Sequence, residues 1–199
     1  MLRRIQSSLF VFVLSFAAVA TAAAQSGQSE KFSNVKIKNF GQMDERFYRG
    51  AQPGAEDYKT LAEIGVKTII DLRNDPQDYA KASAEAAGMK YVNIPMSDKK
   101  RPQDDQIDKF LSVVNDPETG AFYVHCAGGR HRTGVMGAVY RFNHNHWNYD
   151  QVYKEMKQYD YYSRWGHGAL REYVQDYYER HQTKSIEASS GETSSTSNR

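Results

Sequence analysis

The segment that most constrains this chain is residues 121–144, in which a strand-like stretch, a short glycine-containing loop and a helix-like stretch follow one another without a gap. Residues 121–126, AFYVHC, are mostly apolar or aromatic, which is typical of a buried strand. The periodicity of residues 133–144 predicts a helix. A strand that runs through a tight loop into a helix favours a sheet with parallel strands, because parallel strands need a helical crossover between them.

The same alternation extends over the rest of the chain. Residues 66–72, VKTIIDL, and 89–95, MKYVNIP, predict two further strands, and residues 34–50 predict an N-terminal strand pair. Helices are predicted at residues 55–65, 75–88, 104–116, 149–158 and 168–180. The sequence therefore predicts an α/β fold with a mainly parallel central sheet of four to five strands, flanked by helices on both faces. Ligands of such sheets bind at the carboxyl ends of the strands, where the loop after residue 126 lies.

The first 24 residues have the three parts of a secretory signal peptide. Two arginines at positions 3 and 4 supply the positive charge, and residues 9–20 form an apolar stretch that is too short for a comfortable membrane span. The following TAAAQS fits the A-x-A cleavage pattern, with cleavage near Ala24. We expect export to the periplasm or the medium after cleavage; an uncleaved N-terminal anchor is the alternative.

Polar segments flank the predicted folded domain. Residues 25–33 predict a flexible lead-in, and residues 182–199, which are rich in Ser and Thr, predict a disordered tail. Neither segment can bury enough apolar surface to offset the entropy of ordering it. The folded domain is therefore predicted at residues 34–181.

The charge balance of the chain excludes some classes of partner. The chain has 26 Lys and Arg and 24 Asp and Glu side chains, and residues 1–24 contain two of the basic ones and none of the acidic ones. The processed chain therefore has a formal charge of zero. Binding to nucleic acids or anionic membranes usually needs a basic excess, so we expect no nucleic-acid partner and no role on an anionic membrane. We also expect no stable membrane span after cleavage, because the apolar stretch at residues 9–20 is removed with the signal peptide.

Cys126 is the only cysteine, so it cannot form a disulfide within the chain. A thiolate is the nucleophilic form of cysteine, and its pKa falls to about 3.5–7.5 beside cations or a helix N-terminus. We expect both at Cys126, because Arg130 and Arg132 are cations and the helix near Thr133 adds its positive end. A loop of small residues can also turn its N–H groups inward. The predicted phosphate-binding residues are Ala127, Gly128, Gly129, Arg130, His131 and Arg132.

Arg132 and Thr133 complete a pattern suited to chemistry on a tetrahedral dianion. Arg132, six residues after the cysteine, can bind two oxygens at once. Thr133 can donate its hydroxyl to the sulfur and improve it as a leaving group, and His125 is expected to position the cysteine. The pattern predicts in-line phosphoryl transfer through a phosphocysteine intermediate, with no metal or other cofactor. A buried structural cysteine beside solvated basic residues is the alternative.

The motif His-Cys-x5-Arg-Thr resembles that of the cysteine-dependent protein tyrosine phosphatase superfamily, in its compact bacterial dual-specificity type. FYRGAQP, GVKTIIDLRND, YVNIPM and HCAGGRHRTGVMGAVYR occur in the expected order over residues 46–160. The resemblance implies that residues 34–181 are a phosphatase domain. GRHRTG is also similar to the GKHRTG of atypical dual-specificity phosphatases of plants and fungi, some of which act on inositol pyrophosphates.

The family resemblance further implies an aspartic acid on a mobile loop, which protonates the leaving oxygen and then activates water. The chain has no WPD sequence, and by position IPMSDKKRP replaces it. Asp98 in this loop is the favoured general acid. Asp104 and Asp105 are the rivals, although both are placed where the following helix needs an N-cap.

Three function classes remain open from the sequence. The leading one is a metal-independent phosphatase of the phosphotyrosine or dual-specificity type, acting on a phosphorylated protein, inositol phosphate or lipid. An inositol polyphosphate or phytase-like phosphatase with the same mechanism and a non-catalytic binder of phosphorylated ligands are the alternatives. Asp71, Arg73 and Arg49 are expected to form structural ion pairs rather than to contact substrate. His167, which lies between two glycines, predicts a constrained turn without an assigned chemical role.

Overall fold

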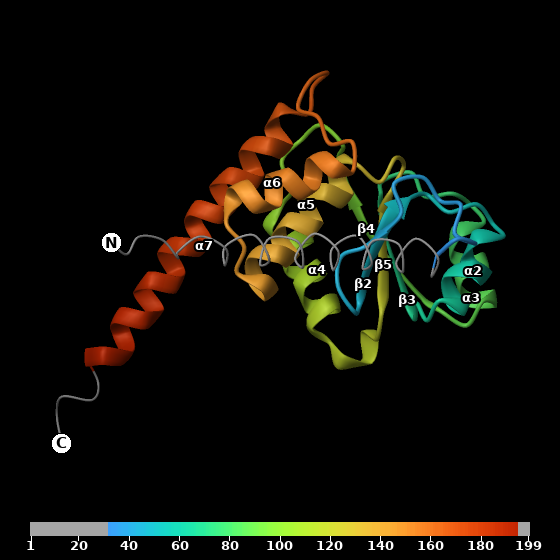
Figure 1. The fold of residues 1–199 in the computed structure, drawn as a ribbon, viewed down its shortest axis with the longest axis horizontal. Helices are drawn as coiled ribbons and strands as arrows, with labels where there is room; N and C mark the ends of the chain where they lie inside the picture. The colour runs from blue at the N-terminus through green and yellow to red at the C-terminus, as the bar shows by residue number, and fades with distance from the viewer. Residues whose placement is uncertain (1–31, 195–199) are drawn as a thin grey trace, which may run out of the picture. The chain divides into compact units, whose positions relative to one another are not determined.

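The computed structural model describes residues 32–194, and side chains from Phe32 to Thr183 (Figure 1). The compact unit that contains the sheet and its helices begins at Lys36. The predicted signal peptide and all but the last two residues of the predicted lead-in lie outside the described residues.

A five-stranded sheet has the order β1-β2-β5-β3-β4, and all neighbours are parallel except β1 and β2. The strands are β1 (Gly41–Gln42), β2 (Phe47–Ala51), β3 (Thr68–Arg73), β4 (Lys90–Met96) and β5 (Phe122–Cys126). Strand β5 lies in the middle, with Val124 opposite Arg49 of β2 and Ile70 of β3. Cys126 is therefore at the carboxyl end of the central strand.

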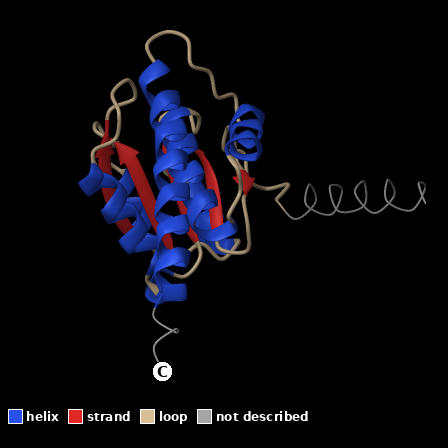
Figure 2. Ribbon diagram, turned by 90° about the vertical axis from the view of Figure 1, so that its left-hand side faces the viewer, coloured by secondary structure: helices blue, strands red, loops and turns tan. Residues whose placement is uncertain are grey.

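Helices cover both faces of the sheet, which confirms the predicted fold class. The helical elements are α2 (Asp57–Glu63), α3 (Ala80–Ala86), α4 (Asp104–Asn115), η1 (Pro117–Thr119), α5 (His131–Tyr140), η2 (Arg141–Asn145), α6 (Tyr149–Gln158) and α7 (Gly168–Ser194). Helices α2 and α3 lie on one side of the sheet, and α4, α5, α6 and α7 lie on the other (Figure 1). Figure 2, viewed from the side of α7, shows the strands behind these helices.

Strands β3 and β5 are buried along their whole length. Each is covered on both faces, which explains why neither sequence alternates strictly between apolar and polar residues. Ile70 and Val124 pack in one core with Phe110 of α4, Val135 of α5 and Leu170 of α7. This core fixes the end of β5 from which the glycine-containing loop emerges.

The predicted N-terminal strand pair is only partly present. Residues 34–40 are not a strand, and the antiparallel partner of β2 is the short strand β1. Asn39 has a positive φ of 54°, which turns the chain out of an extended conformation. A single backbone bond of 2.8 Å from Ala51 N to Lys38 O joins this segment to β2, whose other edge pairs with β5.

One helix start and one helix cap differ from the prediction because local side chains are used elsewhere. Helix α3 begins at Ala80 rather than at Asp75, since the Asp75 carboxylate is paired with the Arg73 guanidinium at 3.0 Å. Helix α4 begins at Asp104, but its N-cap is Gln103, which forms a reciprocal capping box with Gln106. The predicted capping role of Asp104 and Asp105 is therefore wrong; both lie in the first turn.

Helix α7 continues to Ser194, so the prediction of a disordered tail from residue 182 is wrong for residues 182–194. No proline interrupts this polar stretch, and extending a helix that already exists adds a hydrogen bond for each residue that is ordered. Thr183 continues the pattern, since its hydroxyl donates to the Glu179 carbonyl at 3.1 Å. Residues 195–199 lie outside the described part. Among the residues that are described, we find no helix with the length and apolar character needed to span a membrane.

Candidate active site

The loop between β5 and α5 is held from outside by its carbonyl groups. The carbonyl of Ala127 accepts from Gln52 N at 3.3 Å, that of Gly128 from Asn39 Nδ2 at 2.8 Å, and that of Gly129 from Arg49 Nη2 at 2.8 Å. In a planar trans peptide the N–H points away from the carbonyl of the same unit. The three following N–H groups are therefore turned to the opposite side, which forms the predicted concave row of amides.

Gly129 is the glycine that this loop requires. Its φ is +67°, and a Cβ atom at this position would lie 2.4 Å from the carbonyl carbon of Gly50 and 2.6 Å from Ala51 N. Gly128 is different, because its nearest neighbour would be the Arg130 side chain at 3.8 Å. The close approach of the loop to β2 therefore depends on the second glycine alone.

Cys126 is 3% exposed, and its environment favours the thiolate. Burial alone would raise the pKa of the thiol, but the Thr133 hydroxyl, the Arg132 guanidinium and the amides of Thr133 and Arg130 together lower it below its ordinary value. The Thr133 hydroxyl is itself buried and has no oxygen or nitrogen partner in the described part of the chain. It is thus available to the sulfur.

Arg132 lies at the carboxyl edge of the sheet, where three backbone or side-chain oxygens fix its guanidinium. Its Nη1 donates to Met96 O at 3.2 Å, to Asn74 Oδ1 at 3.2 Å and to Leu72 O at 3.4 Å. The side chain is 6% exposed, and Nε is buried without a partner among the described residues. A guanidinium held by one nitrogen in this way keeps donors for an anion bound beside Cys126.

One cavity of about 190 Å³ brings most of the predicted site residues together. It is lined by Asp98, Cys126, Ala127, Gly128, Arg130, His131, Arg132, Tyr162 and His167. Three predicted site residues do not line this cavity. The carbonyl of Gly129 faces Arg49, His125 precedes Cys126 in the sequence, and Thr133 interacts with the Cys126 sulfur.

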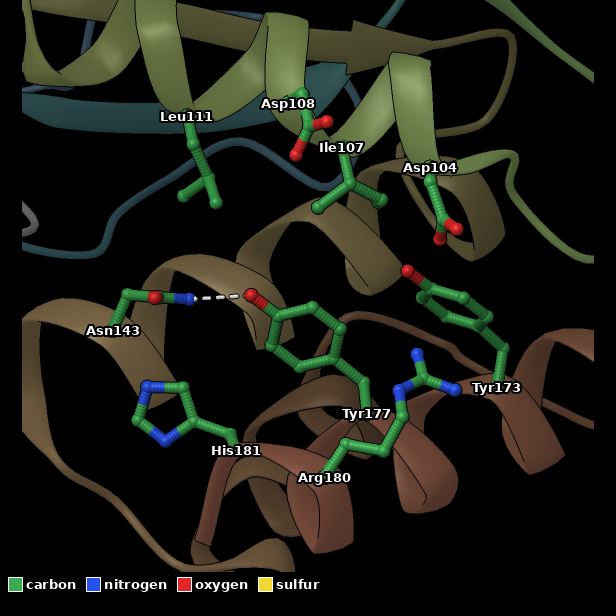
Figure 3. Close-up of a pocket in the computed structure, with 9 residues that line it drawn as sticks. All are labelled: Asp104, Ile107, Asp108, Leu111, Asn143, Tyr173, Tyr177, Arg180 and His181. Atoms are coloured by element: carbon green, nitrogen blue, oxygen red, sulfur yellow. Dashed lines mark hydrogen bonds between the residues drawn. The ribbon is translucent and has the colours of Figure 1, made fainter. Parts of the chain in front are cut away.

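Of the three candidate acids, Asp98 lines the cavity at Cys126. Asp104 belongs to another cavity, of about 620 Å³, whose walls come from α4, η2 and α7 (Figure 3). Asp105 is exposed in the first turn of α4 and lines neither cavity. The geometry therefore favours the loop aspartate over its two rivals.

His125 is buried beneath the loop and stays neutral at neutral pH. Burial lowers the pKa of its imidazole to about 4, although the Asp71 carboxylate opposes the shift from 3.8 Å away. Asp71 is occupied by Tyr91 Oη at 2.7 Å and by the Arg73 amide at 2.8 Å. Asp71 and Arg73 do not line the cavity, which agrees with the structural role expected of both. Arg73, however, forms its ion pair with Asp75 and not with Asp71.

His131, the first residue of α5, is the predicted site residue whose surroundings the sequence revealed least. Its ring stacks on His167 with 3.6 Å between centroids and an angle of 11°, and Tyr162 meets it edge-on at 4.4 Å. Burial lowers the pKa of His131 to about 4, and the neighbouring His167 adds to the shift. The imidazole of His131 is therefore also neutral at neutral pH.

Several residues of the site were missed by the sequence analysis. Asn39 and Gln52 hold loop carbonyls, and Tyr162 and His167 line the cavity. Arg49, expected in a structural ion pair, instead binds the loop through Gly129. The spacing of glycines around His167 was a signal of a special turn, but nothing in the sequence placed that turn beside Cys126. Among the residues that are described, no group of three or more side chains could hold a metal ion.

Residues 15–185 match the family described as PTP-NADK, a DSP-PTPase phosphatase fused to NAD+ kinase. The chain is 35% identical over 96 residues to NAD kinase 2 of Arabidopsis thaliana, a match that covers 45% of this chain and 10% of that protein. It is 28% identical over 142 residues to the dual specificity protein phosphatase TpbA of Pseudomonas aeruginosa, which covers 71% of this chain and 63% of TpbA. The match thus spans a tenth of the first relative and under two thirds of the second.

The fold is also that of solved phosphatase structures. The core catalytic domain of the PP-IP phosphatase SIW14 from Saccharomyces cerevisiae, in complex with citrate, superimposes with a TM-score of 0.63 at 20% identity. The superposition covers 78% of this chain and 94% of that structure. At this identity the likeness concerns the fold.

Proposed function

Because this chain belongs to the family of DSP-PTPase phosphatases, we propose that it hydrolyses phosphate monoesters through a phosphocysteine intermediate without a metal ion. One observation carries the proposal: a cysteine whose pKa is lowered lies in the same cavity as Arg132, at the start of a loop whose carbonyls are tied back. A thiolate, an anion cradle and a fixed guanidinium are the parts needed to attack a phosphoryl group and to stabilise its oxygens.

In the first step the Cys126 sulfur forms a bond to phosphorus while the bond from phosphorus to the leaving oxygen breaks. The electron pair of the broken bond stays on the leaving oxygen, which takes the proton of the Asp98 carboxyl group. The inward amides and Arg132 stabilise the equatorial oxygens. The products are phosphocysteine, a free alcohol and the Asp98 carboxylate.

In the second step water attacks phosphorus and gives its proton to the Asp98 carboxylate. The bond between sulfur and phosphorus breaks, and its electron pair returns to Cys126 as a thiolate. The Thr133 hydroxyl stabilises this thiolate, since it has no competing oxygen or nitrogen partner among the described residues. The imidazole of His125 is neutral and takes no part in proton transfer.

The test is phosphate release from 4-nitrophenyl phosphate and phenyl phosphate by the purified protein, with Cys126→Ser as the matched control. We expect release by the wild type and a loss of at least about a thousandfold in Cys126→Ser, which removes the nucleophile. Wild-type protein that binds phosphate but releases none would favour the non-catalytic binder instead.

We propose phosphotyrosine, phosphoserine and phosphothreonine as the substrate class. Inositol polyphosphates are the second candidate. An observation that favours the second is a hollow of about 450 Å³, lined by the basic Arg130 and Lys157, by Asp160, which pairs with Arg130 at 3.5 Å, and by Tyr161 and Tyr162. It shares Arg130 and Tyr162 with the cavity at Cys126. An additional phosphate of an inositol ring could bind there.

A panel of phosphopeptides, inositol polyphosphates and phosphoinositides separates these substrate classes. Lys157→Met is the informative variant, because Lys157 lines that hollow but not the cavity at Cys126. For an inositol polyphosphate we expect KM to rise several-fold, whereas KM for a phosphotyrosine peptide stays unchanged. Equal effects on both substrates would remove the argument for the second candidate.

We also propose that the protein is exported and that its first 24 residues are removed. The support comes from the charged, apolar and small-residue parts of this segment. Production of the full chain in a secreting bacterium, followed by N-terminal sequencing, is expected to give a chain that starts at Gln25. An intact N-terminus in the membrane fraction would indicate the uncleaved anchor.

A further inference from the structure

His167 lies in the turn before α7 and contacts the loop that carries Asp98. Its Nδ1 lies 2.6 Å from the backbone carbonyl oxygen of Asp98, and since a carbonyl can only accept, Nδ1 is the donor. The His167 side chain is 7% exposed and lines the cavity at Cys126. The ring therefore links the turn before α7 directly to the proposed general acid.

The same ring is also fixed from the side of α5. It stacks on His131, the first residue of that helix, at 3.6 Å, and Tyr162 packs edge-on against both rings, at 4.4 Å from His131 and 5.4 Å from His167. Three segments far apart in the sequence thus meet here: the Asp98 loop, the start of α5 and the turn between α6 and α7.

The other described contacts of the loop that carries Asp98 do not fix the position of the Asp98 carboxyl group. Ser97 Oγ accepts from the amides of Lys99 and Lys100, which shapes the turn but does not join it to the rest of the site. Arg101 pairs with Asp176 of α7 at the far end of the loop. Asp98 itself is exposed. The described contact that ties the Asp98 peptide to the cavity wall is the one from His167.

We propose that His167 is a positioning residue for the reaction: its Nδ1–H holds the Asp98 backbone so that the Asp98 carboxyl group stays over the phosphoryl site. The proposal rests on the proposed function, in which Asp98 protonates the leaving oxygen. His167 touches neither phosphate nor the reacting atoms in this role. Its effect is confined to the two proton transfers of Asp98, one to the leaving oxygen in the first step and one from water in the second.

A misplaced Asp98 slows the substrate with the poorer leaving group most, whereas a general loss of structure slows both substrates alike. Phenolate is a poor leaving group and needs a proton from the acid, whereas 4-nitrophenolate leaves readily without one. The ratio kcat/KM reports the first step alone, because it contains only the steps up to release of the leaving group. In His167→Phe, which keeps an aromatic ring against His131 but lacks the donor, we expect kcat/KM for phenyl phosphate to fall about tenfold or more. For 4-nitrophenyl phosphate we expect kcat/KM to fall less than about threefold.

Asp98→Asn supplies the reference for a double-mutant cycle. Asp98→Asn alone is expected to show the same selectivity for phenyl phosphate, and His167→Phe is expected to add less than about twofold in the Asp98→Asn background. Additive losses would overturn the proposal, as would equal losses on the two substrates. An Asp98→Asn variant without the selective loss also overturns it, because no acid would remain for His167 to position.

A second pair of variants keeps the test valid if His167→Phe does not fold, as judged by thermal unfolding. Asn carries its amide near the place of Nδ1, and Gln carries it near the place of Nε2. We expect His167→Asn to retain turnover of phenyl phosphate within about threefold and His167→Gln to lose it. Equal activities of Asn and Gln variants would overturn the proposal. Cys126→Ser, measured alongside, reports separately on the proposed function, since activity that survives it contradicts the phosphocysteine mechanism but not the contact of His167.

Discussion

At the scale of single residues, the reactivity of Cys126 depends on neighbours that outweigh its burial. Burial favours the neutral thiol, and the Thr133 hydroxyl is the first of the groups that oppose it, followed by the Arg132 guanidinium. A sulfur that is nearly inaccessible to solvent is thereby kept in its nucleophilic form. The hydroxyl therefore matters both for attack and for release of the phosphoryl group.

Thr133→Ala is expected to raise the pKa of the Cys126 thiol, because it removes a hydrogen bond to the charged form. Thr133→Ser keeps the hydroxyl and is the matched control. The measurement is the rate of alkylation by iodoacetamide as a function of pH, whose midpoint reports the thiol pKa. The midpoint of Thr133→Ala should lie at higher pH than that of wild type and Thr133→Ser; a common midpoint for all three would contradict the role of the hydroxyl.

The two loop glycines make a second prediction at this scale. Gly129→Ala is expected to destabilise the fold by at least about 2 kcal/mol, since it combines a left-handed backbone with a Cβ atom 2.4 Å from Gly50. Gly128→Ala is expected to change the free energy of unfolding by less than about 1 kcal/mol. Urea unfolding compares the two variants. Equal losses of stability in the two variants would mean that β2 can move away from the loop and make room for a Cβ atom at position 129.

At the scale of elements, Arg141 joins three parts of the chain. Its guanidinium binds Glu155 of α6 through Nε at 3.1 Å and Nη2 at 2.6 Å, and Nη2 also donates to Met43 O at 2.8 Å. The guanidinium lies 4.2 Å from the centre of the Trp147 ring. The arginine and Glu155 side chains are 6% and 13% exposed, so this bidentate pair is largely shielded from water.

Arg141→Met is expected to destabilise the protein by about 3–5 kcal/mol, because it leaves the Glu155 carboxylate buried without its partner. Lys81→Met is the control, since Lys81 and Glu85 form an exposed pair along α3, with side chains 67% and 56% exposed. Its effect is expected to stay within about 0.5 kcal/mol. Urea unfolding of both variants measures the difference, and similar small losses would show that solvent reaches Glu155.

At the scale of the whole molecule, acid stability follows from two buried imidazoles. The pKa of His125 and of His131 is about 4 in the folded protein, chiefly because of burial, against about 6.5 in an unfolded chain. Between these values the unfolded state binds more protons, so the free energy of unfolding rises with pH in this window. Both histidines thus stabilise the fold above pH 6.5 and lose this contribution as the pH falls towards 4.

The melting temperature is therefore expected to fall between pH 6.5 and pH 4. Carboxylates also take up protons in part of the same range, so the comparison with His131→Phe isolates the histidine contribution. This variant should show a shallower fall than wild type, because one of the two groups that bind protons on unfolding is gone. Parallel curves for the two proteins would contradict the low pKa of His131.

The sequence by itself determined the parts of this protein that depend on neighbours along the chain. The succession of a buried strand, a tight loop and a helix placed Cys126, Arg132 and Thr133 at the carboxyl edge of a parallel sheet. The position of Asp98 after β4 placed it at the same edge, in the cavity that the structure shows. These inferences succeeded because strand and helix periodicity, and the conformation of a short loop, are set by local side chains.

Tertiary structure alone decided what holds that loop and what faces it. Asn39 and Arg49 lie 89 and 80 residues from the glycines whose carbonyls they bind, and they reach them because β2 pairs with β5. His167 is 69 residues from Asp98. Hydrogen bonds over such separations depend on which strands and helices become neighbours in the core.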